Sequence, residues 1–292
     1  MNRRFHIVDV FAQEKYSGNQ LAVVTDAADL STEEMQAIAA EMNYSETTFV
    51  TGQKEDGAWP VRIFTPTDEV PFAGHPTLGT AGVIREQLAD GTPATVTLDL
   101  KVGEILVDVR ERDGRETLWM RQREPEFGEE LDHSQLADVL GLSPDQLDDE
   151  WPVQELSTGL PTIIVPLVDR DALTDIDLDR DAYDELVEDR DPKLVHAFCP
   201  DARESANDFA VRMFAPALGV LEDPATGSAN GCLTAYLAAH ESTGGPSFEA
   251  RVEQGYEMGR PSLLFLAGDA SGEGVDVQVG GAVVPVADGE LR

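Results

Sequence analysis

The chain has few cysteines and no long apolar run among its 292 residues. No apolar stretch reaches the roughly 18 residues of a membrane-spanning helix, so none is expected. The two cysteines, Cys199 and Cys232, form neither a CxxC pair nor a disulfide framework, and we expect small buried residues rather than catalytic ones. The five histidines include no HExxH motif and no Cys/His cluster. The sequence therefore predicts no metal site.

The sequence also lacks the features of a secretion signal. It begins MNRRFHIVDV, where two arginines lead directly into a strand-like pattern. The apolar stretch and the small-residue cleavage site of a signal peptide are missing. We therefore expect a cytoplasmic protein.

Basic residues are scarce as well. The chain has 56 Asp and Glu against 21 Lys and Arg, and its formal net charge is −35. A field this negative repels nucleic acid and anionic membranes, so we expect neither as a partner. Because the acids are spread along the whole chain, we favour a halophilic cytosol, where about 1 M salt screens their repulsion. A local acidic surface that binds a protein partner is the alternative.

What the sequence does contain is a hidden duplication. Three pairs of segments resemble each other in the same order along the chain. They are residues 17–24 and 158–165, residues 62–66 and 212–216, and residues 75–81 and 223–229. Together they indicate two copies of one unit, and this alignment places His75 and Asp223 at equivalent positions.

Each copy reads as a mixed α/β unit with mostly antiparallel strands. Helices are predicted at residues 32–42, 76–87, 134–140, 180–189 and 228–240. Strands are predicted at residues 5–11, 21–25, 46–51, 61–65, 95–100, 104–110, 116–121, 153–157, 162–167, 194–199, 208–214, 248–254, 262–267 and 275–279. The acidic, turn-rich residues 125–150 suggest a boundary. We expect an N-terminal half of residues 1–125, its sheet completed by the last residues of the chain, and a C-terminal half of residues 126–292.

Two loops, residues 72–81 and 222–229, each lead into a predicted helix, with Pro76 expected at the first helical position. A helix start exposes unpaired N–H groups and the positive end of the helix dipole, which suit a substrate carboxylate. The candidate substrate-binding residues are Gly74, Pro76, Thr77, Gly227 and Ser228. Ordinary helix capping is the alternative for either loop alone. The duplication favours a shared site in the cleft between the halves.

Three ionisable residues are candidates for catalysis. Glu46 stands at the start of a predicted strand, where burial would bring the pKa of its carboxyl group toward neutrality and suit it to proton transfer. His75 and Asp223, in the two loops, could pass or position a proton. Ser45 and Glu46 could instead cap a helix, His75 could be a half-buried histidine with satisfied hydrogen bonds, and Asp223 could be a helix cap.

Long motifs identify a family. They are VDVF at residues 8–11, GNQLAVV at 18–24, MNYSETTF at 42–49, RIFTP at 62–66, EVPFAGHPT at 69–77, EDPATGSA at 222–229 and QGYEMGRP at 254–261. On these motifs the sequence resembles, along its whole length, the PhzF-like family of phenazine-biosynthesis isomerases and their relatives.

The resemblance implies an α+β diaminopimelate epimerase-like fold. In that fold two similar halves each wrap a mostly antiparallel sheet around a central helix, and the active site lies between them. The resemblance also implies a homodimer and a reaction that needs no cofactor. The family's catalytic glutamate corresponds to Glu46, its site histidine to His75 and its site aspartate to Asp223, while Gly74 and Ser228 match pocket-lining positions. The characterised phenazine enzyme isomerises trans-2,3-dihydro-3-hydroxyanthranilate, its glutamate moving a proton between ring carbons.

Related epimerases and proline racemases use two opposed cysteines, and this chain departs from that pattern. Ala73 stands near the position of the first cysteine, and the segment from Asp223 to Pro224 stands near the second. The leading hypothesis is therefore an isomerase that moves a proton within a small carboxylate-bearing substrate. The alternatives are an epimerase or racemase of amino or hydroxy acids, and a non-catalytic small-molecule binding protein.

Overall fold

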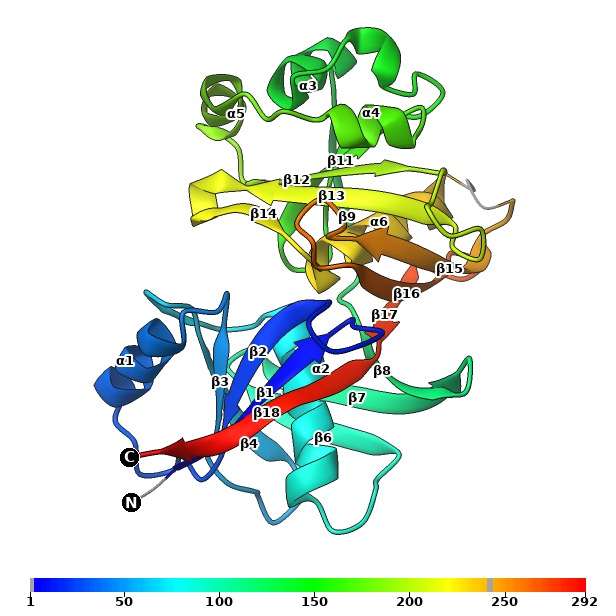
Figure 1. Cartoon of the computed structure of the whole chain (residues 1–292). Coiled ribbons are helices and arrows are strands. Elements are labelled where there is room, and N and C mark those ends of the chain that lie inside the picture. The colour runs from blue at the N-terminus through cyan, green and yellow to red at the C-terminus, as the bar shows by residue number, and fades with distance from the viewer. Residues whose placement is uncertain (1–2, 241–243) are drawn as a thin grey trace. The chain divides into compact units, whose positions relative to one another are not determined.

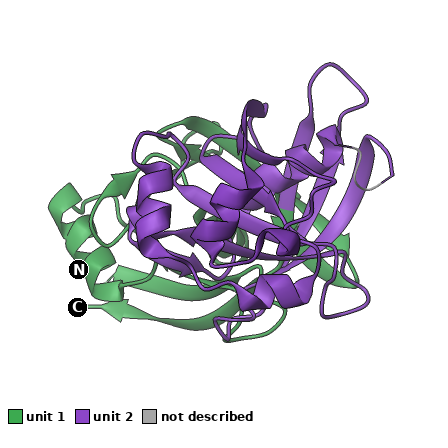
Figure 2. Cartoon of the chain, turned by 90° about the horizontal axis from the view of Figure 1, so that it is seen from above, with its two compact units in different colours: residues 1–121, 280–292 green, residues 122–279 purple. Residues whose placement is uncertain are grey.

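The computed structural model describes residues 3–240 and 244–292, and the chain divides into two compact units. Unit 1 comprises Met1–Arg121 with Gly280–Arg292, and unit 2 comprises Gln122–Val279 (Figure 2). Each unit is a mostly antiparallel sheet around one central helix that is almost entirely buried (Figure 1). Within the described ranges, no helix combines the length and the apolar character that crossing a membrane requires.

Unit 1 is built around α2 (Gly74–Val83), whose ten residues are all buried. Its elements are β1 (Arg3–Val10), β2 (Asn19–Val24), α1 (Thr32–Met42), β3 (Thr47–Val50), β4 (Trp59–Phe64), β5 (Glu69–Val70), α2, the π-helical turn η1 (Ile84–Leu88), β6 (Thr95–Leu100), β7 (Gly103–Arg112), β8 (Arg115–Arg121) and β18 (Val283–Leu291). Strand β1 pairs with β18 and β2, and α2 contacts strands from both ends of the sheet. Gly79 permits this close packing, because a Cβ atom there would lie 2.6 Å from Leu21.

Helix α1 lies on the outer face of unit 1. Ser31 accepts a hydrogen bond from the Glu34 backbone while the Glu34 side chain accepts one from the Ser31 backbone, a reciprocal capping box that fixes the start of the helix. The buried residues Met35 and Ala39 pack against Phe49 and other side chains of the sheet.

Unit 2 is built in the same way around α6 (Gly227–Ala239). Its other elements are β9 (Glu126–Leu131), α3 (His133–Leu140), η2 (Pro144–Gln146), β10 (Val153–Ser157), β11 (Pro161–Pro166), α4 (Arg170–Asp175), α5 (Arg180–Val187), β12 (Leu194–Cys199), β13 (Phe209–Ala215), η3 (Pro216–Leu218), β14 (Val220–Asp223), β15 (Ser247–Gln254) and β16 (Ser262–Asp269). Strand β17 (Asp276–Gly281) leads the chain back into unit 1.

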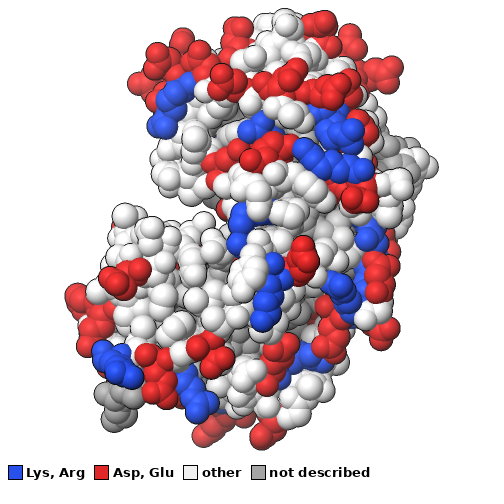
Figure 3. All heavy atoms as spheres, viewed as in Figure 1, with Lys and Arg blue, Asp and Glu red and all other residues white. Residues whose placement is uncertain are grey.

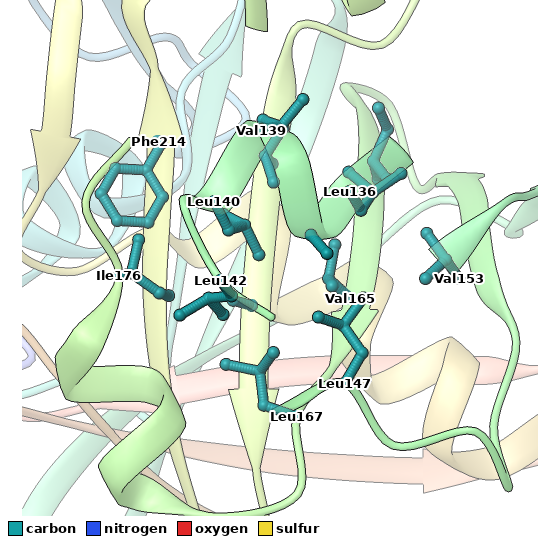
Figure 4. Close-up of a cluster of buried hydrophobic side chains, with 14 of the residues drawn as sticks. Leu136, Val139, Leu140, Leu142, Leu147, Val153, Val165, Leu167, Ile176 and Phe214 are labelled. Atoms are coloured by element: carbon teal, nitrogen blue, oxygen red, sulfur yellow. The ribbon is translucent and has the colours of Figure 1, made fainter. Parts of the chain in front are cut away.

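One face of the unit 2 sheet is covered by the outer helices α3, α4 and α5. Leucine and valine side chains of α3 pack onto Val165 of β11 and its neighbours in a large apolar cluster (Figure 4). The opposite face packs on α6, where Ala229 meets Leu194 and Met213. Alternate residues of β12 therefore face two different layers, as strand geometry requires.

The duplication is visible as a repeated ion pair. In unit 1, Arg62 donates two hydrogen bonds of 2.8 Å to Glu69, and in unit 2, Arg212 donates two of 2.8 and 3.0 Å to Glu222. The partners are 7 residues apart in unit 1 and 10 apart in unit 2, where η3 is inserted. The arginine positions match the sequence alignment, whereas the glutamates and the helices that follow are displaced by this insertion.

The displacement corrects the predicted equivalence of His75 and Asp223. His75 is the second residue of α2, and its counterpart in α6 is Ser228. Asp223 ends β14, and its counterpart is Val70 at the end of β5. The residue that matches Ala73, the N-cap of α2, is Thr226, the N-cap of α6, rather than Asp223 or Pro224.

Three further predictions about secondary structure are corrected. Helix α2 begins at Gly74 rather than at Pro76, so Pro76 is its third residue, where its missing N–H would still have no partner within the helix. Helix α6 begins at Gly227, one residue earlier than predicted. Residues 126–131, part of the predicted turn-rich boundary, form β9, which pairs with β10.

Candidate active site

Glu46 and His75 meet within unit 1. Glu46 directly precedes β3, one residue before the strand begins, and its side chain is 18% exposed. Its Oε2 lies 3.3 Å from Nε2 of His75 in the first turn of α2. Among the described residues Nε2 is not aligned for a hydrogen bond, so the pair is in contact without one. We call Glu46 and His75 the acid–imidazole pair.

The sheet and the central helix hold this pair in place. Thr48 of β3 and Thr80 of α2 share a buried hydrogen bond of 2.7 Å, which connects the strand after Glu46 to the helix that carries His75. In the same helix the Thr77 hydroxyl donates a 2.7 Å hydrogen bond to the carbonyl oxygen of Ala73. Thr77 therefore secures the first turn of α2 from within.

Burial keeps His75 neutral. The side chain is almost fully enclosed, and the loss of hydration lowers its pKa to about 3 even though a hydrogen bond to the Gln20 backbone acts in the opposite direction. Since Nε2 faces Glu46, Nδ1 is the nitrogen that donates to Gln20, and Nε2 is left as an acceptor. An acceptor facing a carboxyl oxygen is favourable when the carboxyl group carries the proton.

The two central helices differ from the outer helices at their N-termini. The outer helices begin with side-chain caps from Ser31, Asp132, Asp169 and Asp179. In the described structure, α2 and α6 have no side-chain cap and no acid in the first turn. In a chain with 56 acidic residues, the first turns of these two helices contain no acidic residue of their own, which suits an incoming anion, and the carboxyl groups nearest to them are those of Glu46 at His75 and Asp223 at Thr226.

Each predicted substrate-binding residue lies at one of these helix starts. Gly74, Pro76 and Thr77 are the first, third and fourth residues of α2, and all are buried. Gly227 and Ser228 are the first two residues of α6 and are buried as well. Each set lies within its own unit.

Asp223 belongs to a buried polar cluster in unit 2 that the sequence did not reveal. Its carboxylate accepts a hydrogen bond from the Thr226 hydroxyl. Gln254, at the end of β15, bonds to the Asp223 backbone and to Thr226. Gln254 stands in the QGYEMGRP motif, so the sequence marked the segment but gave no sign of the contact. We call residues 223–226 the Asp223 loop.

Both cysteines are poor nucleophiles in this structure. Burial raises the pKa of the Cys199 thiol to about 11 and raises that of Cys232 as well. Cys232 lies in the middle of α6, next to Thr158 and backbone carbonyls rather than at the helix start. Among residues 3–240 and 244–292, no three His, Cys, Asp or Glu side chains are grouped as metal ligands would be.

Together these features define a class of protein. Two units in one chain, each a sheet wrapped around a central helix, are typical of the epimerase-like fold. A hydroxyproline epimerase from Agrobacterium vitis has this fold, with a TM-score of 0.58 at 12% identity over 99% of this chain and 92% of that one. At this identity the likeness concerns the fold alone.

The family is narrower than the fold. The model of the phenazine biosynthesis-like protein family matches residues 8–289. The chain is 36% identical over 291 residues to the trans-2,3-dihydro-3-hydroxyanthranilate isomerase of Pseudomonas aeruginosa, covering 98% of each chain. The crystal structure of a PhzF-family phenazine biosynthesis protein from Bacillus anthracis matches with a TM-score of 0.92 at 28% identity, over 100% of this chain and 99% of that one. The chain belongs to this PhzF family and is an isomerase, which confirms the predicted family, fold and enzyme class.

Proposed function

We propose that this isomerase moves a proton between two carbons of a small carboxylate-bearing substrate, without a cofactor, and that Glu46 carries the proton. The observation that supports this most directly is the 3.3 Å contact between Glu46 and an imidazole held neutral by burial. A neutral His75 with a free acceptor nitrogen favours the protonated form of Glu46. The resting pair then holds a proton ready to donate.

The reaction balances within the substrate. Protonated Glu46 donates to one carbon, and the double bond shifts as that carbon–hydrogen bond forms. The resulting carboxylate removes the proton from the second carbon and is restored to its acid form, so no proton is consumed. His75 stabilises the acid form at the beginning and the end of the cycle.

The N-termini of α2 in unit 1 and of α6 in unit 2 are each a candidate position for the substrate carboxylate. Each offers unpaired backbone N–H groups and the positive end of a helix dipole, in first turns without acidic side chains. We propose that Asp223, whose carboxylate is oriented by Thr226, positions a polar group of the same substrate. The substrate named for the Pseudomonas aeruginosa relative carries a carboxylate, an amine and a hydroxyl, which fits both assignments.

An epimerase reaction is less well supported. Thiol-based racemisation needs two reactive cysteines, whereas Ala73 and Thr226 occupy the two N-cap positions, and burial raises the pKa of both cysteines. The reactions differ in D2O. An isomerase places deuterium at the carbon that loses the double bond, while an epimerase labels a stereocentre and leaves the double bond in place.

Replacing Glu46 by Gln tests the proposal. The amide keeps the shape of the side chain but cannot carry the proton, so we expect kcat on trans-2,3-dihydro-3-hydroxyanthranilate to fall by about a thousandfold. The exposed Glu41, at the end of α1, gives a matched control, and Glu41→Gln should leave kcat unchanged. Full turnover by Glu46→Gln would reject Glu46 as the proton carrier. Failure of the wild type to convert this compound would reject the assigned substrate.

A further inference from the structure

Gln254 uses its whole hydrogen-bonding capacity on the loop before α6 and on the first turn of that helix. The side chain is 1% exposed. Its Nε2 donates to the carbonyl oxygen of Asp223 at 2.8 Å and to Oγ1 of Thr226 at 3.0 Å. Its Oε1 accepts from the backbone N of Thr226 at 3.1 Å and from Nδ2 of Asn230 at 2.9 Å. An amide has two donors and two lone pairs, so all four are used.

These contacts fix the direction of the hydrogen bonds. The backbone N–H of Thr226 can only donate, so the atom of Gln254 that it meets must be the oxygen. The Gln254 nitrogen therefore donates to the Thr226 hydroxyl, whose own proton is left for the carboxylate of Asp223. The result is a directed chain from the amide through the hydroxyl to the carboxylate.

The hydroxyl of Thr226 does not cap the N-terminus of its own helix. Thr226 is the N-cap residue of α6, and a threonine there normally accepts a hydrogen bond from the first turn of its helix. In the described structure it makes no such bond. The same hydroxyl that orients Asp223 thus leaves the helix start open.

Unit 1 shows that the fold does not need this chain. Strand register aligns β6 with β15, so Leu100 occupies the position of Gln254. The counterparts of Thr226 and Asp223 are Ala73 and Val70. Unit 1 forms the same strand, loop and helix with three apolar residues. The polar chain is therefore specific to the unit that contains Asp223.

We propose that Gln254 is a positioning residue for the reaction and that it acts through Thr226 to hold the Asp223 carboxylate ionised and correctly aimed. This inference rests on the proposed function, in which Asp223 contacts the substrate. Two other contacts fix only the backbone of the loop. Ser262 donates a 2.8 Å hydrogen bond to the carbonyl oxygen of Pro224, and a Cβ atom at Gly255 would lie 2.5 Å from that same oxygen.

Thr226→Val keeps the shape of the side chain and removes its hydroxyl, whereas Thr226→Ser keeps the hydroxyl and removes the methyl group. In the valine variant Asp223 loses a hydrogen bond to its charged form, so its titration midpoint should rise by about 1 pH unit, measured by NMR on protein with 13C-labelled aspartate. The signal is assigned by its absence in Asp223→Asn. Thr226→Ser should match the wild type. Equal midpoints in Thr226→Val and the wild type would overturn the proposal, and this measurement needs no substrate.

Kinetics test the link to catalysis. Gln254→Glu keeps the acceptor for Thr226 and Asn230 but removes both donors. With trans-2,3-dihydro-3-hydroxyanthranilate as the probe, Gln254→Glu and Thr226→Val should lower kcat by about 10- to 100-fold, because misplaced groups are costly in rate. In both variants the acid limb of the pH profile of kcat should also move to higher pH. Ser262→Ala, which affects only the loop backbone, should lower stability without moving that limb.

A double variant distinguishes this inference from the proposed function. If Thr226 acts through Asp223, Thr226→Val should have no further effect on kcat in the Asp223→Asn background. Additive losses would overturn the positioning role. Wild-type turnover by Asp223→Asn would instead reject the role of Asp223 in the proposed function. Loss of turnover in Asp223→Asn with full turnover in Thr226→Val and Gln254→Glu would overturn only the inference about positioning.

Discussion

At the scale of single residues, burial decides which protonation state His75 can offer to Glu46. An exposed imidazole would be partly charged near pH 6.5 and would hold Glu46 as a carboxylate. Enclosure lowers the pKa of His75 to about 3, so the ring stays neutral through the physiological range. The acid–imidazole pair therefore differs from a salt bridge, and it favours a protonated glutamate.

NMR can test the neutrality of His75 directly. Between pH 8 and pH 5 its ring signals should not titrate, because the pKa of about 3 lies well below that range. His75→Asn identifies the signal by its disappearance. A titration midpoint near the ordinary value of about 6.5 would contradict the proposed resting state of the pair.

The sequence offered candidate site residues but little of their geometry. Glu46, His75 and Asp223 were selected by motif, yet the contact between Glu46 and His75 joins segments that pattern cannot bring together. The predicted equivalence of His75 and Asp223 was wrong because η3 shifts the second copy after the Arg212 strand. The contacts of Gln254 with Asp223 and Thr226 were not predicted because these partners lie about 30 residues away along the chain.

At the scale of elements, β12 carries a buried polar residue, His196, for which the described side chains around it offer no hydrogen bond. His196 is completely buried on the face toward α6, and neither ring nitrogen has a hydrogen-bond partner within the described residues. Its counterpart in unit 1 is Thr48, since each pairs with the residue after the arginine that both units carry on the neighbouring strand. Thr48 bonds to Thr80, whereas the matching position in α6 is Leu233. Among the residues described, His196 thus lacks the kind of threonine partner that Thr48 has in unit 1.

Replacing His196 by Leu should stabilise the protein. The substitution removes an unpaired polar group from the core, a gain of about 1–3 kcal/mol in the free energy of unfolding. Thr48→Val is the matched control and should destabilise by a similar amount, because it leaves Thr80 unpaired. Thermal melts of both variants at neutral pH test the pair. A lower melting temperature for His196→Leu would show that the imidazole has a partner in solution.

The same substitution should change the response to acid. Burial lowers the pKa of His196 to about 3, so in the native state it stays neutral while the unfolded chain takes up a proton below pH 6.5. Above pH 6.5 His196 is neutral in both states, so it adds no pH dependence to the free energy of unfolding. As the pH falls from 6.5 toward 3, protonation of the unfolded chain lowers the free energy of unfolding by up to about 1.4 kcal/mol per pH unit. The melting temperature of His196→Leu should therefore fall less between pH 7 and pH 5 than that of the wild type.

Elements with a clear local signal were predictable. Helix α1 has the predicted bounds, residues 32–42, and the structure shows a capping box of Ser31 and Glu34 at its start. Strand β9 and helix α4 were missed, and β18 was expected only as the last residues of the chain that complete the sheet; β9 is largely exposed and rich in acids and shows little apolar alternation. In a chain this acidic, surface strands lose the pattern that reveals them.

At the scale of the whole molecule, the dominant feature is the charge of −35. Asp and Glu side chains are scattered over the face in Figure 3, with smaller groups of Lys and Arg among them. Scattered like charges repel one another over a distance set by the salt concentration, about 10 Å at 0.1 M and about 3 Å at 1 M. This distribution favours a general dependence on salt over a single acidic docking surface.

Stability should therefore rise with KCl. Between about 0.1 M and 2 M KCl we expect the melting temperature to increase by roughly 10 °C, because screening removes self-repulsion that opposes the compact state. A variant with Asp149→Lys and Glu150→Lys, two exposed acids in unit 2, provides the control. It should melt higher than the wild type at low salt and at the same temperature in 2 M KCl, because the advantage is electrostatic. A melting temperature that does not change with KCl would reject the halophilic interpretation, and an equal advantage at both salt concentrations would show that the variant acts through local structure instead of charge.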